Sequence, residues 1–248
     1  MNGVRLAMSW LTVLPVRGPE AVDRAAGARA IGWAPLVGAL IGVGAACLMW
    51  LLGFLGASSL LAGFVGVAAL ALVTRGMHVD GLADTMDGLG SYGPPERARE
   101  IMKSGGVGPF GVAALVFALG IQAVSFAALV ENERWLGVVV AVLVGRVAVV
   151  FACRRGIDAA PGAGFGALVA GTQRPAVRAL WAGIAAVAAG FATDQWWLGP
   201  IAVLMALGSA TVLVQHCVRR FGGLNGDVLG AALELAVTIA AAVLTLRP

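Results

Sequence analysis

The chain has 248 residues, of which 60% are hydrophobic and only 12% are charged, and its mean hydropathy is +0.92. A soluble domain is nearer to half apolar and a quarter charged, so the composition excludes an ordinary soluble domain and predicts an integral membrane protein in a lipid bilayer. Seventeen Lys and Arg against thirteen Asp and Glu leave a net charge of +4, which in a membrane protein reflects topology, so no nucleic-acid partner is expected.

Apolar windows define the predicted elements. The first segment, residues 1–16, is apolar but too short to span a membrane, and its Arg5 and the charged residues that follow predict an interfacial segment. A span needs about 20 apolar residues, and seven later windows qualify, although the second is short and the fifth is rich in alanine. These windows are Trp33–Leu55, Ser58–Thr74, Pro109–Val130, Trp135–Cys153, Ala176–Thr193, Trp196–Gln215 and Val228–Leu246. We therefore predict an all-α, polytopic helical bundle of about seven transmembrane helices, forming one membrane-embedded catalytic domain over residues 1–248.

Basic residues fall on one side of these predicted spans. Arg134 and Arg247 lie on the other side, and Arg146 lies inside the fourth span. The remaining fourteen are Arg5, Arg17, Arg24, Arg29, Arg75, Arg97, Arg99, Lys103, Arg154, Arg155, Arg174, Arg178, Arg219 and Arg220. Cytoplasmic loops are enriched in Lys and Arg, so we predict a multi-pass protein of the cytoplasmic membrane whose polar loops, and hence its active site, face the cytoplasm. A transporter would more often hold its polar groups at mid-membrane.

Three carboxylates follow the second window, in the stretch TRGMHVDGLADTMDGLGSYG. If this stretch is helical, Asp80, Asp84 and Asp87 have the spacing i, i+4 and i+7 and share one face. Two unit charges 4 Å apart repel by about 4 kcal/mol at an effective dielectric near 20, so a cation is expected, and oxygen ligands suit Mg²⁺. The alternative is a solvated helix start whose acids complement the helix dipole. His78, just before the cluster, would bind a substrate phosphate or relay a proton, or it is an interfacial histidine with a backbone partner.

The second polar motif is KSGGVGPFG. Lys103 precedes Gly105, Gly106 and Gly108, and Pro109 is placed as the first residue of the third span. Glycines before a helix start leave backbone amides free to bind an anion, so this motif is a predicted phosphate site. A flexible hinge is the alternative.

The third motif is RRFGGLNGDVLGAALELA, which leads into the last span. Asn225 and Asp227 lie at the mouth of this span, and Glu234 follows on the same helical face about two turns deeper. An acidic residue inside a membrane helix indicates a functional site, although Asp227 would also serve as a helix cap. Arg146 is the predicted partner of Glu234 or of a substrate phosphate.

These motifs together resemble a known family. HVDGLADTMDGLG is similar to the HLDGLADTADGL signature of cobalamin synthase, the adenosylcobinamide-GDP ribazoletransferase of vitamin B12 assembly, and the segments WLTVLPVRG, WAPLVGALIG, IMKSGGVGPFG and GGLNGDVLGAALELA match further family motifs in the same order. The chain departs from the family at Ser104 and Gly106, where Asp and Arg are common, at Asn225, where Thr is usual, and at Val237, where Glu is found.

The resemblance implies a Mg²⁺-dependent membrane enzyme. It would join adenosylcobinamide-GDP to α-ribazole or α-ribazole 5′-phosphate and release GMP, and a homo-oligomer is compatible with the sequence. On this basis Asp80, Asp84 and Asp87 would hold the metal, and Asp87 or Asp227 would accept the proton of the attacking hydroxyl. The expected substrate-binding residues are Lys103, Gly105, Gly106, Gly108, Asn225, Arg146 and Glu234. The alternatives are a CDP-alcohol phosphotransferase, whose usual DGxxAR pattern is incomplete in DGLADT, and a transporter or cobamide-binding membrane subunit.

Overall fold

The computed structural model describes residues 3–18 and 21–247, and within these ranges the regular structure is helical apart from two isolated bridges, Arg154–Gln173 and Ala159–Leu224. The helices are α1 (Gly3–Leu11), α2 (Arg24–Phe54), α3 (Ser59–Val73), α4 (Met77–Gly90), α5 (Pro95–Met102), α6 (Pro109–Glu131), α7 (Trp135–Ala152), α8 (Gly164–Val169), α9 (Pro175–Gly190), α10 (Leu198–Phe221) and α11 (Gly226–Leu244). The predicted all-α polytopic membrane bundle is therefore confirmed.

The predicted count of seven spans is not confirmed. Among the described residues, five helices are long and apolar enough to cross a membrane, namely α2, α6, α7, α10 and α11. Helices α3 and α4 meet at a bend of 91° and would give a sixth span if counted together. Helix α9, from the alanine-rich window, has 16 residues, which at 1.5 Å per residue is about 24 Å, short of a hydrocarbon core of about 30 Å.

The N-terminal segment is a short helix, as its length predicted. Its described part begins at Gly3, and α1 covers nine residues, too few to cross a bilayer. The helix packs on α2 and buries Leu6, Ala7 and Leu11. This segment therefore forms part of the wall of the bundle.

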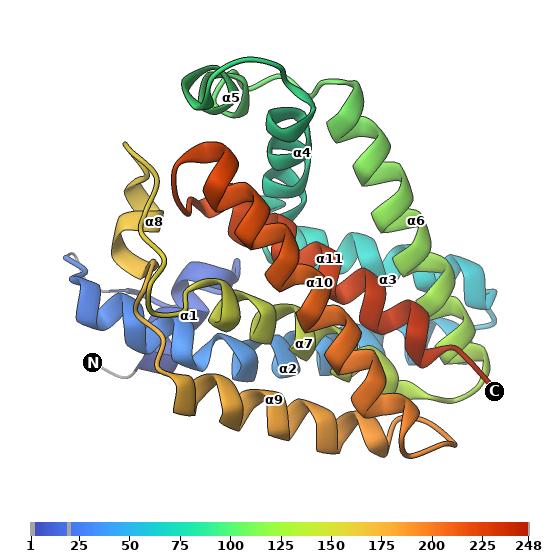
Figure 1. The fold of residues 1–248 in the computed structure, drawn as a ribbon. Coiled ribbons are helices and arrows are strands. Elements are labelled where there is room, and N and C mark those ends of the chain that lie inside the picture. The colour runs from blue at the N-terminus through green and yellow to red at the C-terminus, as the bar shows by residue number, and fades with distance from the viewer. Residues whose placement is uncertain (1–2, 19–20, 248) are drawn as a thin grey trace.

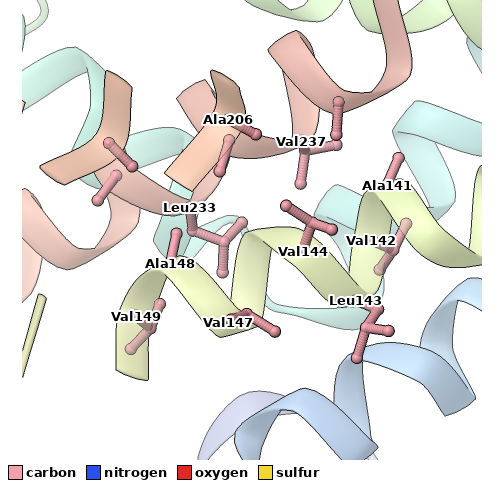
Figure 2. Packing of buried hydrophobic residues seen from close by; sticks show 14 of the residues in the cluster. Ala141, Val142, Leu143, Val144, Val147, Ala148, Val149, Ala206, Leu233 and Val237 are labelled. Carbon is pink, nitrogen blue, oxygen red and sulfur yellow. The ribbon is translucent and has the colours of Figure 1, made fainter. Parts of the chain in front are cut away.

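The core of the bundle lies around α7 and α11, which are buried along most of their length. Figure 2 shows Val144 and Ala148 of α7 near Leu233 and Val237 of α11, with Ala206 of α10 close by. All five side chains are buried. Since these helices have few lipid-facing positions, they provide a fixed frame for the polar groups described below.

The two ends of the bundle differ in character. Helices α5 and α8 and the turn between α10 and α11 lie toward one end in Figure 1, whereas the turns after α6 and α9 and the C-terminus lie toward the other. Nine of the fourteen basic residues identified above lie in or near these segments of the first end along the chain, while Arg5, Arg17, Arg24 and Arg29 lie in α1 and around the start of α2, and Arg75 lies in the α3–α4 bend. At the second end Arg134 pairs with Asp194, and Arg247 donates a hydrogen bond to Asn132.

The bend between α3 and α4 has a local cause. Arg75 and Gly76 both adopt left-handed backbone conformations, with φ of 58° and 69°, so the helix cannot continue through them. The Arg75 guanidinium donates a 2.8 Å hydrogen bond to the carbonyl oxygen of Trp10 in the last turn of α1. The bend turns α4, with its three aspartates, across the direction of α3 (Figure 1).

Candidate active site

The three aspartates of α4 occupy three different environments. Asp80 is exposed, Asp84 is half-buried, and Asp87 is buried with only 7% of its surface accessible. The α4 helix packs against α11 on one side and α6 on another. The three carboxylates lie along one helix, as the spacing predicted, but different neighbouring helices, α11 and α6, determine their surroundings.

Asp87 caps helix α6. Its carboxylate accepts hydrogen bonds from the backbone amides of Gly108, at 2.7 Å, and Gly111, at 2.9 Å. A β-carbon on either glycine would lie within 2.6 Å of an Asp87 carboxylate oxygen, so only glycine leaves room for this contact. The sequence assigned these amides to a substrate phosphate and Asp87 to a metal, but in the structure the two predicted groups bind each other.

Asp227 lies close to the aspartates of α4 because α4 and α11 approach without a side chain between them. A β-carbon on Gly81 would lie 2.8 Å from the Asp227 carbonyl oxygen. Asp80, Asp227 and Asp87 all lie close enough to Asp84 for their negative charges to act on its carboxyl group. Asp227 of α11 thus belongs to the carboxylate cluster around Asp84, although it is not one of the three aspartates spaced along α4.

The donor set fits a hard divalent cation bound jointly with substrate. None of these four aspartates takes part in an ion pair with another described residue, so their negative charge is not neutralised by a close basic partner. Among the described residues, however, no group of three His, Cys, Asp or Glu side chains is close enough to hold a metal ion without other ligands. Mg²⁺ commonly takes one or two carboxylates and completes its shell with water and substrate phosphate, and Asp80 and Asp84 suit that arrangement.

A cavity of about 400 Å³ leads from these carboxylates into the bundle. Asp80 and Asp227 line it together with His78, Arg75 and Arg146. The remaining wall is largely apolar, contributed by Trp10, Leu11, Ile31, Ala34, Met77, Val149, Phe165, Gly226, Leu229, Gly230 and Leu233. The cavity thus combines two acidic groups, two guanidinium groups and an apolar surface, which suits an anionic substrate that carries an apolar portion.

The sequence did not predict two aromatic walls of this cavity. The rings of Trp10 and Phe165 meet edge to face, with centroids 5.0 Å apart, and they come from the N-terminal segment and from α8. Both lie far in sequence from the aspartate motif, and no spacing rule connects them to it. Arg75 was counted only for topology, although its position directly after an apolar window and before the aspartates was a signal that it lies near them.

Glu234 belongs to a buried polar network below this cavity. Its carboxylate accepts a 2.8 Å hydrogen bond from Gln122 of α6, and Gln122 also donates to the Thr238 hydroxyl. Arg146 and His78 line a small cavity shared with Glu234, yet Arg146 and Glu234 form no ion pair among the described residues. The Arg146 Nε atom is buried with no hydrogen-bond partner within the described part of the chain.

The other predicted binding residues do not line this cavity. Lys103 is exposed at the end of α5, followed by the exposed Gly105 and Gly106. Asn225 caps α11, its side-chain oxygen accepting a 3.0 Å hydrogen bond from the Val228 amide. The cap of α11 is therefore Asn225 and not Asp227, which leaves the Asp227 carboxylate free to line the cavity.

Comparison with known proteins gives a consistent result. The family model described as cobalamin-5-phosphate synthase matches residues 3–245. A protein of Corynebacterium efficiens named adenosylcobinamide-GDP ribazoletransferase is 41% identical, covering 97% of this chain and 90% of that protein. Proteins with the same name from Frankia casuarinae and Bradyrhizobium diazoefficiens are 37% and 33% identical, covering 99% and 92% of this chain and 94% and 87% of theirs. No solved structure matches the chain. The chain belongs to the cobalamin-5-phosphate synthase family.

Proposed function

We propose that this chain is an adenosylcobinamide-GDP ribazoletransferase, which joins adenosylcobinamide-GDP to α-ribazole or α-ribazole 5′-phosphate and releases GMP. The observation that carries the proposal is the cavity in which Asp80 and Asp227 face Arg75 and Arg146, in a chain of this family. Phosphoryl transfer depends mainly on positioning and on neutralising charge, and this cavity brings both signs of charge together.

The reaction is a displacement at phosphorus. The ribose hydroxyl oxygen of ribazole attacks the phosphorus on the cobinamide side, the bond from that phosphorus to the bridging oxygen breaks, and GMP leaves with the bridging oxygen. Asp227 is placed to accept the hydroxyl proton, because its carboxylate lines the cavity and does not cap α11. Arg75 and Arg146 would bind phosphate oxygens, and Lys103, whose charge acts on Asp227, would bind the departing GMP.

Asp80 and Asp84 are the residues we propose as Mg²⁺ ligands, and Asp87 acts instead by holding α6 against α4. When bound, Mg²⁺ would neutralise the pyrophosphate and so favour departure of GMP. We further propose that the site faces the cytoplasm from the cytoplasmic membrane, because fourteen of the seventeen Lys and Arg residues fall on one side of the predicted spans. His78, buried and facing both cavities, would orient a substrate phosphate.

The test is product analysis with purified protein in lipid vesicles. Adenosylcobinamide-GDP and Mg²⁺ are supplied with α-ribazole that carries ¹⁸O at its attacking hydroxyl, and products are identified by mass spectrometry. The label should appear in the new phosphodiester and not in GMP. Label in GMP, or transfer of the guanylyl group to ribazole, would contradict the proposed direction. Turnover that survives complete chelation of divalent cations would contradict the metal assignment but not the transferase assignment.

A further inference from the structure

A second groove lies on the opposite side of α2 from the catalytic cavity. It has a volume of about 750 Å³ and lies between α2, α9 and the segments that flank α8. Ile31 and Ala34 of α2 line the catalytic cavity, whereas Ala28 and Gly32 of the same helix line this groove. The groove is therefore separate from the carboxylate site.

The mouth of the groove is strongly basic. Arg29, Arg155 and Arg174 line it, and no acidic residue is among the described residues that do so. All three are exposed, and within the described chain none forms an ion pair or donates a side-chain hydrogen bond. Beside Arg155 and outside the groove lining, burial and, to a lesser extent, the charge of Arg178 lower the pKa of Arg154, so two further basic residues lie close to each other near this mouth.

The groove also has a preformed floor. The Trp181 indole nitrogen donates a 2.8 Å hydrogen bond to the Gly32 carbonyl oxygen, and the buried Gln173 donates a 2.9 Å hydrogen bond to the Ala28 carbonyl oxygen. The rings of Trp33 and Trp181 lie edge to face, with centroids 6.4 Å apart. Tryptophan is enriched where membrane meets water, so this pair places the groove at the level of lipid headgroups.

Below the tryptophans the groove continues as an apolar track along α9. Leu180 and Ile184 line both the groove and a second hollow of about 570 Å³, whose other residues are Ala179, Gly183, Val187 and Ala188. Leu180, Ile184 and Val187 are exposed. A β-carbon on Gly183 would meet no atom within 4 Å, so the track is open at this point.

We propose that this groove binds one anionic phospholipid, with the headgroup phosphate at Arg29, Arg155 and Arg174 and an acyl chain along α9. Three unpaired guanidinium groups match a phosphate, and basic pockets between membrane helices bind anionic headgroups. A soluble anion would use the arginines but would gain nothing from the apolar track. The combination of charge and track therefore selects a lipid.

Tryptophan quenching by brominated lipid tests the proposal. The whole protein is placed in phosphatidylcholine vesicles with a small fraction of phosphatidylglycerol, and bromine is carried on the acyl chains of one lipid or the other. Brominated phosphatidylglycerol should quench Trp33 and Trp181 with an apparent affinity roughly tenfold higher than brominated phosphatidylcholine. The Trp33→Phe/Trp181→Phe variant should lack this excess quenching.

Two further variants separate the site from general surface charge. Arg29→Gln/Arg155→Gln/Arg174→Gln should abolish the preference, whereas Arg5→Gln/Arg17→Gln/Arg219→Gln, which removes three exposed charges elsewhere, should retain it. Gly183→Phe keeps every arginine but fills the track, and it should also abolish the preference. Equal quenching by both lipids in the native protein, an equal loss in both arginine variants, or competition by millimolar inorganic phosphate would overturn the proposal.

Discussion

Asp84 and Asp87 are three residues apart on one helix, yet they differ in their surroundings. Asp87 is buried and accepts hydrogen bonds from two backbone amides of α6, while Asp84 is half-buried among Asp80, Asp87 and Asp227. A buried carboxylate that accepts an amide hydrogen bond on each oxygen holds two helices together, so we expect the main role of Asp87 to be structural. A half-buried carboxylate close to three other carboxylates, with no ion-pair partner among the described residues, is suited to bind a cation.

Replacing Asp87 by Asn should destabilise the fold. An amide side chain has one acceptor oxygen, so one of the two amide hydrogen bonds would be lost and an NH₂ group would face an N–H. The loss of a charge-assisted bond and a buried unsatisfied group together cost about 1–3 kcal/mol. Thermal unfolding in detergent should show a lower melting temperature, while turnover per folded molecule falls only modestly. A native melting temperature with abolished turnover would instead make Asp87 catalytic.

Replacing Asp84 by Asn should have the opposite effect. The change removes a negative charge from a crowded group at nearly constant volume, so stability should be unchanged or higher. Turnover should fall by at least about tenfold, because a group that neutralises charge in phosphoryl transfer contributes more than 1.4 kcal/mol. The measurement is the Mg²⁺ dependence of the initial rate, and wild-type rates at low Mg²⁺ would exclude Asp84 as a ligand.

At the scale of elements, the site depends on how closely α4 approaches α11. Gly81 faces the Asp227 backbone, and Gly230 of α11 faces the His78 backbone, where a β-carbon would lie 3.0 Å from the His78 carbonyl oxygen. This contact through glycines places Asp80 and Asp227 on one cavity. The Arg220 guanidinium, which donates a 3.0 Å hydrogen bond to the Ser91 carbonyl oxygen, fixes the end of α4 to α10.

Adding one methyl group at Gly81 should separate these helices. In Gly81→Ala the new β-carbon would lie 2.8 Å from a backbone oxygen, which cannot move without shifting α11, and overpacking of this kind costs about 1–3 kcal/mol. We expect a lower melting temperature and a lower kcat, because the aspartates would move away from Asp227. Gly120→Ala on α6 is the matched control, since its β-carbon meets nothing within 4 Å, and it should be neutral or slightly stabilising. Equal behaviour of the two variants would contradict the role given to this contact.

The elements that were predictable are those encoded by local composition. Apolar windows located every long helix of the bundle, and the glycine-rich motifs marked the starts of α6 and α11. The path of the chain after Arg75 was not predictable, because the left-handed conformations of Arg75 and Gly76 carry no hydropathy signal. The pairing of Asp87 with the start of α6 and of Gln122 with Glu234 depends on contacts between helices, which a single sequence does not specify. The structure therefore brings the aspartate motif next to the starts of α6 and α11, as far as Asp87 and Asp227 are concerned. Within these motifs, however, Asp87 contacts backbone amides while Asp80 and Asp227 line the cavity.

At the scale of the whole molecule, charge and chemistry share one end of the bundle. The segments around α5 and α8 and the α10–α11 turn carry nine of the basic residues, and the cavity with Asp80 and Asp227 is lined in part by residues from α8 and α11. The opposite end has short turns closed by local contacts such as Arg134 with Asp194. This arrangement fits the proposed function, in which the substrates would reach the carboxylates from a single aqueous compartment.

The side of the membrane that the aspartate-bearing end of the bundle faces can be tested directly. Because Lys and Arg are retained in the cytoplasm, Tyr92, which is 96% exposed between α4 and α5, should face inward. Gln195, exposed in the α9–α10 turn, should face outward. Single cysteines at these two positions, in a background from which Cys47, Cys153 and Cys217 have been removed, should react with a membrane-impermeant maleimide from opposite sides of oriented vesicles. Turnover of each variant confirms that it is folded. Labelling of both cysteines from the same side would refute the arrangement of the helices, and labelling from opposite sides in the reverse sense would move the active site out of the cytoplasm.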